Sequence, residues 1–308
     1  MTGVPIPPPG AHGGDGARVA AALGIDPAAV LDLSASLNPF APDVAALAHR
    51  RLDALGRYPD VAGAEAALAA GLGLDPDRLV LTAGGAQAIA LVAGQERAGW
   101  VEEPDFGLYR RHLARLDPAA PRWRSDPHNP SGRLAGPDER AGVWDEAFLP
   151  LAAGTWSRDR PGWALGSLTK AFACPGLRLG YALAPDGEAA AALRRARPEW
   201  AVGGLACALV PDLVERADPP AWTAAVAKAR AELAGMLAAR GRAALASDAP
   251  WVLVPRAAGL RDALAREAVV VRDCASFGVE DHVRIAVPDA DGLERLDRAL
   301  SRISHAAE

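Results

Sequence analysis

A lysine near the middle of the chain lies among residues that could carry out chemistry together. Hydroxyl, glycine and arginine residues share its segment: Ser167, Thr169, Gly176, Arg178 and Gly180. A guanidinium matches a phosphate bidentately, hydroxyls add charge-assisted hydrogen bonds, and Gly176 and Gly180 would let the backbone approach closely. Because the neighbours of Lys170 are apolar, we expect Lys170 and Arg178 to be held in a partly buried site. The segment indicates a reactive amine beside an anion site.

An amine and an anion site at this spacing fit one cofactor, pyridoxal 5'-phosphate. Lys170 could bond to the aldehyde of the cofactor, while Ser167, Thr169 and Arg178 bind its phosphate. The alternative is a surface lysine and arginine in a loop rich in glycine and proline. Lysine occurs only at positions 170 and 228, so substitution of Lys170 distinguishes these two interpretations.

Such a cofactor also needs an anionic partner for its pyridine nitrogen and a cup for its phosphate. Asp145 ends a short apolar segment and could keep that nitrogen protonated, although an aspartate at a strand end can equally cap a turn. The turn formed by Gly84, Gly85 and Ala86 precedes a predicted helix, whose first N–H groups suit a phosphate. Glycine turns before helices are common, so this turn also has an ordinary structural explanation.

Two further residues could contact the ring of the cofactor. Asn129 precedes Pro130 and could donate to the ring hydroxylate; the alternative is an ordinary Asn-Pro turn. Phe106 follows Pro104 closely and could stack on the ring, or could simply pack in the core.

Two arginines near the end of the chain could bind a substrate. Arg272 ends one predicted strand, and Arg284 lies within the next between two apolar residues. An arginine directed from a strand into a cleft suits a carboxylate or phosphate, so this pair predicts a substrate with two anionic groups. The alternative is one surface salt bridge for each arginine.

The bulk composition narrows the class of protein. The 308 residues are half hydrophobic and carry a formal net charge of −5, which argues against nucleic-acid binding. The cysteines, Cys174, Cys207 and Cys274, show no metal-binding spacing, and we expect no metal. With no long apolar span and no signal-peptide pattern in the sequence, we expect a reduced, cytoplasmic protein without a membrane segment.

Predicted strands and helices alternate over the middle of the chain. We expect helices around residues 17–23, 43–55, 62–71, 86–95, 203–217, 219–242, 259–267 and 290–303. We expect short strands around residues 31–36, 78–82, 100–104, 142–146, 162–166, 251–254, 269–272 and 282–287. Residues 117–137, rich in proline, aspartate and arginine, are predicted to be irregular. The pattern predicts an α/β protein whose parallel sheet binds ligands at the strand carboxyl ends.

Taken together, these residues resemble the fold-type I, aspartate-aminotransferase-like family of pyridoxal phosphate enzymes. The resemblance is carried by three segments, 129–132, 145–148 and 167–181. It implies a mostly parallel sheet in a large domain at 41–200, an N-terminal arm and small-domain segment at 1–40, and a smaller α+β domain at 201–308. It also implies the cofactor roles given above for Lys170, Asp145, Asn129, Phe106, Ser167, Thr169, Arg178 and the turn at 84–86.

The same resemblance implies a homodimer with shared active sites, because Tyr58 would reach the cofactor phosphate of the other subunit. Within the family, the chain is most similar to L-threonine O-3-phosphate decarboxylases of cobalamin biosynthesis, with histidinol-phosphate aminotransferases as the nearest relatives. The similarity to the decarboxylases would place His12, Ser34, Arg272 and Arg284 around the phosphate and carboxylate of the substrate.

The sequence departs from this family pattern in several places. Gly203 and Ser36 stand where asparagine is expected, and Phe148 replaces a tyrosine of many aminotransferases, as it does in the decarboxylases. The large domain is short, so we expect a helix or strand of the usual domain to be missing or reduced. The sequence predicts decarboxylation of a phosphorylated amino acid. Transamination and a catalytically idle cofactor-binding partner protein remain alternatives.

Overall fold

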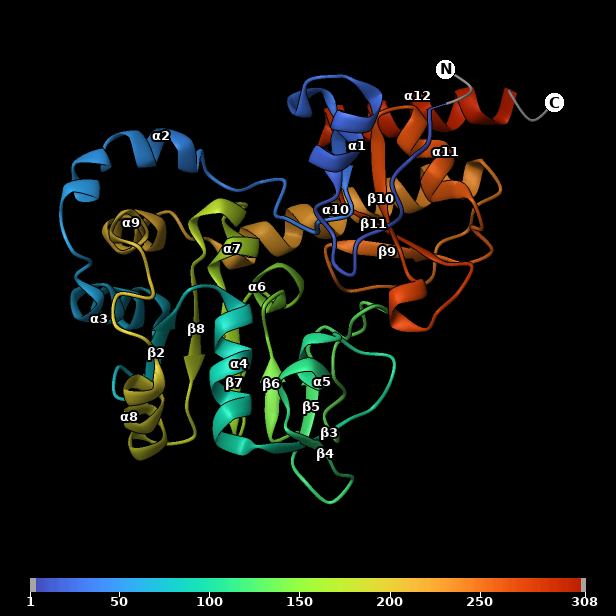
Figure 1. Ribbon diagram of the computed structural model, residues 1–308. Helices are drawn as coiled ribbons and strands as arrows, with labels where there is room; N and C mark the ends of the chain where they lie inside the picture. The colour runs from blue at the N-terminus through green and yellow to red at the C-terminus, as the bar shows by residue number, and fades with distance from the viewer. Residues whose placement is uncertain (1–3, 306–308) are drawn as a thin grey trace.

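The computed structural model describes residues 4–305; residues 1–3 and 306–308, at the ends of the first and last predicted domains, lie outside the described residues. Within 4–305 the strands form one sheet of seven and one of four (Figure 1). Figure 1 shows the larger sheet in the lower part of the molecule and the smaller sheet at its upper right. In the same range no helix combines the length and hydrophobicity needed to cross a membrane.

The larger sheet is mostly parallel, as predicted. Its strands run in the order β2 (Leu79–Thr82), β8 (Gly180–Leu183), β7 (Trp163–Ser167), β6 (Val143–Asp145), β5 (Arg122–Ser125), β3 (Ala98–Val101) and β4 (Arg115–Leu116). Only β8 runs against its two neighbours, β2 and β7, in this sheet. The carboxyl ends of β5, β6 and β7 therefore meet at one edge, where an α/β sheet binds its ligands.

Helices cover both faces of this sheet because its strands are apolar on both faces. One face carries α4 (Gly85–Glu96), α5 (Leu108–His112) and α8 (Gly187–Ala196). The other carries α3 (Val61–Leu72), α6 (Leu149–Ala152), α7 (Leu168–Ala171) and α9 (Gly204–Glu215), with α2 (Val44–His49) beside α9. Along β2, Leu79 and Leu81 pack in the core on the α3 and α9 face, and Val80 packs in the core on the α4 and α8 face. Successive side chains of a strand point to opposite faces in this way.

The smaller sheet joins the two ends of the chain. Its order is β1 (Leu31–Leu33), β10 (Val269–Asp273), β11 (Val283–Ala286) and β9 (Trp251–Val254), with β1 parallel to β10. Its helices are α1 (Gly16–Leu23), α10 (Pro219–Ala239), α11 (Leu260–Arg266) and α12 (Ala290–His305). Short 3₁₀ turns complete the elements: η1 (Pro27–Ala29), η2 (Leu52–Gly56), η3 (Pro175–Leu177) and η4 (Ala275–Phe277).

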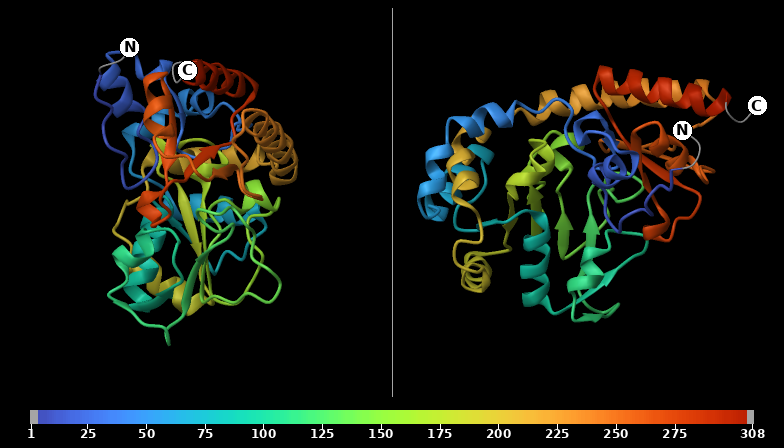
Figure 2. Two further views of the ribbon diagram at one scale, coloured as in Figure 1. Left: turned by 90° about the vertical axis from the view of Figure 1, so that its right-hand side faces the viewer. Right: turned by 45° about the horizontal axis from the view of Figure 1, so that its top comes forward.

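One long helix connects the two sheets. Trp222, near the start of α10, packs in a core of the large sheet, whereas Leu233 and Leu237 pack under the small sheet. Figure 2 shows α10 running along the top of the molecule beside α12. The predicted domain boundaries, at residues 40/41 and 200/201, stay predictions.

One part of the sequence interpretation is wrong in an informative way. Segment 117–137, predicted to be irregular, contains β5, an interior strand of the large sheet. The arginines of Arg122-Trp123-Arg124 are typical of a surface loop, yet Arg124 is buried. Its guanidinium lies 5.8 Å from the ring centroid of Trp144, and its Nε bonds Glu139 at 2.7 Å. An ion pair and an aromatic face allow a charged residue inside a sheet.

Other elements differ from the prediction in their extent. The helix expected at 43–55 is interrupted and forms α2 and then η2. Strand β8 and helix α8 were not predicted, and the strand expected at 100–104 is β3, which begins at Ala98 and ends at Val101. The large sheet keeps seven strands in the described range, whereas the connection 126–142 between β5 and β6 contains no helix there. The reduction expected in the large domain stays a prediction.

Candidate active site

Polar side chains line a cavity between the carboxyl edge of the large sheet and strands of the small sheet. Most of the residues predicted from the sequence line this cavity: His12, Ser34, Gly85, Ala86, Phe106, Asn129, Asp145, Ser167, Thr169, Lys170, Arg178, Arg272 and Arg284. Asp145 and Ser167 are the last residues of β6 and β7. The fold thus brings together residues from both ends of the chain in one place.

Lys170 lies on the short helix α7, directly after β7. Burial is the main cause that lowers the pKa of its ammonium group to about 8, and Arg284 and Arg178 lower it further, while Asp145 acts in the opposite direction. Its Nζ lies 5.7 Å from the ring centroid of Phe148. A lysine with a lowered pKa is neutral, and hence nucleophilic, for a larger part of the time near neutral pH.

Asp145 has a partner that the sequence interpretation missed. The hydroxyl of Tyr109 donates to Asp145 Oδ2 at 2.8 Å, and the backbone N–H of Ala147 donates to Oδ1 at 3.1 Å. Burial nevertheless raises the pKa of Asp145 to about 6. Tyr109 follows Phe106 by three residues, and their rings lie 5.8 Å apart, so this spacing could have pointed to Tyr109. The contacts fix a partly buried carboxylate whose charge a cationic ligand would stabilise.

The glycine turn and Arg178 form a cup with room for an anion. Gly84 has φ of +81°, and a Cβ built on it would lie 2.5 Å from Arg178 Nη2, so only glycine leaves the guanidinium where it is. Gly85 and Ala86 start the twelve-residue helix α4, whose first N–H groups have no acceptor within the helix. The donors of this cup suit the phosphate of pyridoxal 5'-phosphate.

Other residues of the lysine segment differ from the prediction. Arg178 is exposed rather than partly buried, and it holds a left-handed backbone conformation with φ of +52°. A Cβ on Gly180 would come within 2.8 Å of Gly166 O, as expected for close packing, whereas a Cβ on Gly176 would meet no atom of the described structure within 4 Å. Gly176 therefore makes no close approach to the protein, and its approach to a cofactor stays a prediction. The hydroxyl of Thr169 donates to Leu179 O at 3.2 Å.

Asn129 connects the two halves of the cavity. Its Oδ1 accepts a hydrogen bond of 2.6 Å from Nη1 of Arg284, so its amide N–H groups remain to face the cavity. Phe106 lies opposite, with its ring 5.5 Å from that of His12. An aromatic face and an amide on the same cavity fit a flat heterocyclic ring.

The two predicted substrate arginines are neighbours on the small sheet. Arg272 of β10 and Arg284 of β11 are register partners, with only 5% and 6% of their surfaces exposed. Within residues 4–305, Nε of both groups and Nη1 of Arg272 lack a hydrogen-bond partner. Burial and the charge of Arg272 lower the pKa of Arg284 to about 10. Buried cations with unsatisfied N–H groups are costly, and a bound anion would offset this cost.

The N-terminal arm closes the other side of this region. Ala11 O accepts a hydrogen bond of 2.7 Å from Arg272, which fixes the arm next to exposed His12. Partial desolvation of its ring lowers the pKa of His12, and the charge of Arg272 acts in the same direction. The Ser34 hydroxyl donates to Asp32 at 2.6 Å and accepts from Gly14 N–H at 2.8 Å. The contacts of Ser34 thus hold the arm.

Two predicted residues lie elsewhere. Gly84 lies directly behind the cavity wall, against Arg178. Tyr58 is 80% exposed on the segment before α3, its ring 4.8 Å from that of Trp200, and it does not line the cavity of its own chain.

Comparison with known proteins places the chain in a family. The model of "Aminotransferase class I and II" matches residues 126–303, which is more than half of the chain. The chain belongs to this family. It is therefore an enzyme of the pyridoxal phosphate-dependent, aminotransferase-like type, and the expected cofactor is confirmed.

Individual relatives include both reaction types. Threonine-phosphate decarboxylase from Salmonella typhimurium is 32% identical over 64% of this chain and 68% of that protein. Histidinol-phosphate aminotransferase 2 from Methylococcus capsulatus is 28% identical over 89% of this chain and 90% of that protein. The structure of histidinol-phosphate aminotransferase from Sinorhizobium meliloti, in complex with pyridoxal 5'-phosphate, has a TM-score of 0.80 at 19% identity and covers 95% of each chain. The last similarity establishes the fold.

Proposed function

We propose that the chain decarboxylates a phosphorylated amino acid, with L-threonine O-3-phosphate as the first candidate and (R)-1-aminopropan-2-yl phosphate as the product. The observation that carries this proposal is the buried pair of Arg272 and Arg284, in which Nε of both groups and Nη1 of Arg272 have no hydrogen-bond partner among the described residues. Such a pair calls for a ligand with two anionic groups. This substrate has a carboxylate and a phosphate.

The charges in the cavity support the same substrate class. Arg178 and the start of α4 form the cup proposed for the cofactor phosphate, so their charge is already used there. Arg272 and Arg284 remain at the other end, with His12 beside them. Histidinol phosphate has one anionic group and would leave one arginine without a partner, whereas threonine phosphate engages both.

The mechanism assigns a task to each residue of the cavity. Bound at Lys170, the cofactor supplies an electron sink for the bond broken at the substrate Cα. Asp145, held by Tyr109, provides the negative charge that keeps the ring nitrogen protonated. Arg284 would bind the substrate carboxylate and so orient the bond between Cα and the carboxylate for cleavage. After CO₂ leaves, the ammonium group of Lys170 donates the proton that takes its place on Cα.

Transamination is the second candidate because relatives of that type align with about nine-tenths of this chain. The same residues would serve it, with the Cα–H bond in place of the Cα–carboxylate bond. Incubation of cofactor-loaded protein with L-threonine O-3-phosphate, with and without a keto acid, distinguishes the two. CO₂ and the aminoalkyl phosphate formed without a keto acid support decarboxylation; turnover that requires a keto acid supports transamination. No turnover with or without the keto acid, despite bound cofactor, supports the idle partner protein.

We also propose that two copies form a dimer with shared active sites. Exposed apolar side chains gather around η2 and the loop before α9: Leu52, Leu55, Tyr58 and Trp200. An exposed group of this kind supports a protein interface, and Tyr58 would contact the cofactor phosphate of the second copy. Light scattering of Tyr58→Phe and wild type, together with their cofactor affinities, tests both parts. A monomeric wild type contradicts the proposal.

The proposed product would serve cobalamin biosynthesis in a reducing cytoplasm. The pathway follows from the resemblance to the decarboxylases of cobalamin biosynthesis, and the three cysteines, which are buried and free of disulfide bonds, support the reducing compartment. Rescue of a cobalamin auxotroph that lacks its threonine-phosphate decarboxylase tests this role.

A further inference from the structure

A buried carboxylate with no task in the proposed mechanism lies behind the cavity. Asp105 is 3% exposed, in the loop between β3 and α5. Burial outweighs its hydrogen bonds and raises the pKa of this carboxyl to about 6. Its hydrogen-bond partners come from Ser125 and Phe106 rather than from a cation. A buried carboxylate without a close cation lowers the free energy of unfolding. Its presence here suggests that its contacts serve the function of the cavity.

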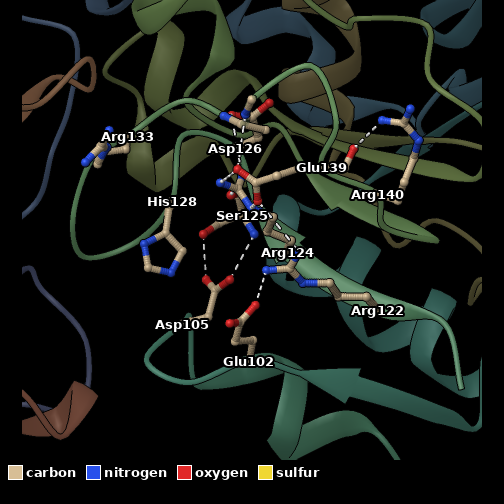
Figure 3. Close-up of polar contacts among 12 residues, drawn as sticks. Glu102, Asp105, Arg122, Arg124, Ser125, Asp126, His128, Arg133, Glu139 and Arg140 are labelled. Carbon is tan, nitrogen blue, oxygen red and sulfur yellow. Dashed lines mark hydrogen bonds and ion pairs between the residues drawn. The ribbon is translucent and has the colours of Figure 1, made fainter. Parts of the chain in front are cut away.

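Asp105 is linked to the cofactor side of the cavity by a short chain of hydrogen bonds. Its Oδ1 accepts from Ser125 Oγ at 2.5 Å, and its Oδ2 accepts from Ser125 N at 3.1 Å. Ser125 Oγ in turn accepts from the backbone N–H of Asn129 at 2.8 Å. Figure 3 shows Asp105 beneath Ser125, with both dashed contacts between them. The carboxylate thus fixes the hydroxyl that holds Asn129.

A second tie joins the same two loops. His128 Nε2 lies 2.8 Å from Pro104 O, and its Nδ1 lies 2.8 Å from Ser131 Oγ. A carbonyl oxygen only accepts, so Nε2 carries the proton, and in the neutral ring Nδ1 accepts from Ser131. Burial lowers the pKa of His128, which favours this neutral form. The loop at 104–105 therefore holds the turn at 125–131 at two points.

Side chains hold the turn at 125–131 in place because no helix of the described chain directly follows it to do so. The turn that carries Asn129 opens the connection 126–142, which contains no helix among the described residues. On the other side of the turn, Asp126 accepts from Ala135 N–H at 2.8 Å and pairs with Arg160 at 2.7 Å. Polar side chains thus hold the first part of this connection, from Asp126 to Ala135.

We propose that Asp105 is a positioning residue for cofactor binding, which acts through Ser125 to fix the turn that presents Asn129. This inference rests on the proposed role of Asn129 at the cofactor ring. Asp105 itself touches neither the cavity nor the reacting atoms.

The test compares the cofactor affinity of full-length variants. The dissociation constant for pyridoxal 5'-phosphate is measured on cofactor-free protein by quenching of tryptophan fluorescence, for Asp105→Ala, Asp105→Asn, Ser125→Ala, Asn129→Ala and the double variant of Asp105 and Ser125. We expect Asp105→Ala and Ser125→Ala each to weaken binding about tenfold. The double variant should bind no more weakly than the weaker single variant. Asp105→Asn keeps an acceptor for Ser125 N–H and should recover part of the affinity.

Glu102→Gln is the matched control, because Glu102 is an exposed carboxylate of the same segment that pairs with Arg122. It should bind the cofactor like wild type. Wild-type affinity in Asp105→Ala and Ser125→Ala, together with weak binding in Asn129→Ala, overturns this inference and leaves the role of Asn129 intact. Wild-type affinity in Asn129→Ala overturns that role instead. Fully additive effects in the double variant also contradict the inference, and if Asp105→Ala does not fold, Ser125→Ala decides.

Discussion

The two ends of the cavity hold positive charge in opposite ways. At the cofactor end, Arg178 is exposed, and the remaining donors are backbone N–H groups of α4. At the substrate end, Arg272 and Arg284 are buried side by side, and some of their N–H groups have no partner in residues 4–305. Water can solvate the first end when no ligand is bound, but it reaches the second poorly.

This difference separates binding of the cofactor from selection of the substrate. Without its ligand, the cofactor end lowers the free energy of unfolding only slightly, because water can solvate its charge. The substrate end carries a desolvation cost from its two buried arginines, and only an anion of matching shape offsets this cost. Specificity is therefore expected at the small sheet, and general affinity for the cofactor at the large sheet.

Loss of Lys170, which lies between the two ends, should have the largest effect. Lys170→Ala removes both the amine that holds the cofactor and the proposed proton donor, so turnover should fall at least ~10³-fold. Lys228→Ala is the control, since Lys228 is the other lysine and its side chain is 82% exposed. Turnover and visible absorbance of the purified proteins check both. Lys170→Ala with near-normal turnover would falsify the assignment.

Asp145, at the cofactor end, should make the free energy of unfolding depend on pH. The pKa of Asp145, about 6 in the folded protein, is above the ordinary value of 3.8. Its contribution therefore favours folding most below pH 4 and is lost as pH rises through 6. Cofactor-free Asp145→Asn should gain about 2 kcal/mol of unfolding free energy over wild type between pH 4 and pH 8. Urea unfolding at both pH values measures it; an equal difference at both contradicts the burial effect.

Substitution of Arg284, at the substrate end, should lower activity and raise stability. Arg284→Met should lower kcat/KM about 50-fold, because the carboxylate loses its partner. The same variant should raise the unfolding free energy of the ligand-free protein by about 1–2 kcal/mol, since an incompletely paired buried cation is gone. Arg298→Met, at an exposed arginine of α12, should change neither quantity. Kinetics and urea unfolding decide, and a less stable Arg284→Met would show that its present contacts outweigh its burial.

The smallest effect is expected at the support of Asp145. Tyr109→Phe removes one hydrogen bond to the carboxylate, and kcat/KM should fall about tenfold. Tyr181→Phe is the matched control. It loses a buried hydroxyl bonded to Trp156 O at 3.0 Å, away from the cavity, so it should affect stability alone. Equal kinetic losses in both variants would mean that Tyr109 acts only through general packing.

Local patterns predicted much of this molecule. Periodic apolar residues located most helices and strands, and the segment around Lys170 pointed to the cofactor, which membership of the family confirms. The same reasoning missed β5, because Arg122 and Arg124 suggest a loop unless their ion pairs are known. It also missed Tyr109, whose importance depends on a contact with Asp145 across 36 positions of sequence.

The sequence by itself determined the cofactor chemistry, because a lysine, its hydroxyls and Arg178 lie within twelve consecutive residues and need only one turn to meet. Only the tertiary structure decided which charges are buried and unpaired. Arg272 and Arg284 became neighbours through strand pairing, and Ala11 reached Arg272 across 261 positions. Burial and pairing depend on what surrounds a side chain in space, and short-range sequence does not specify those surroundings.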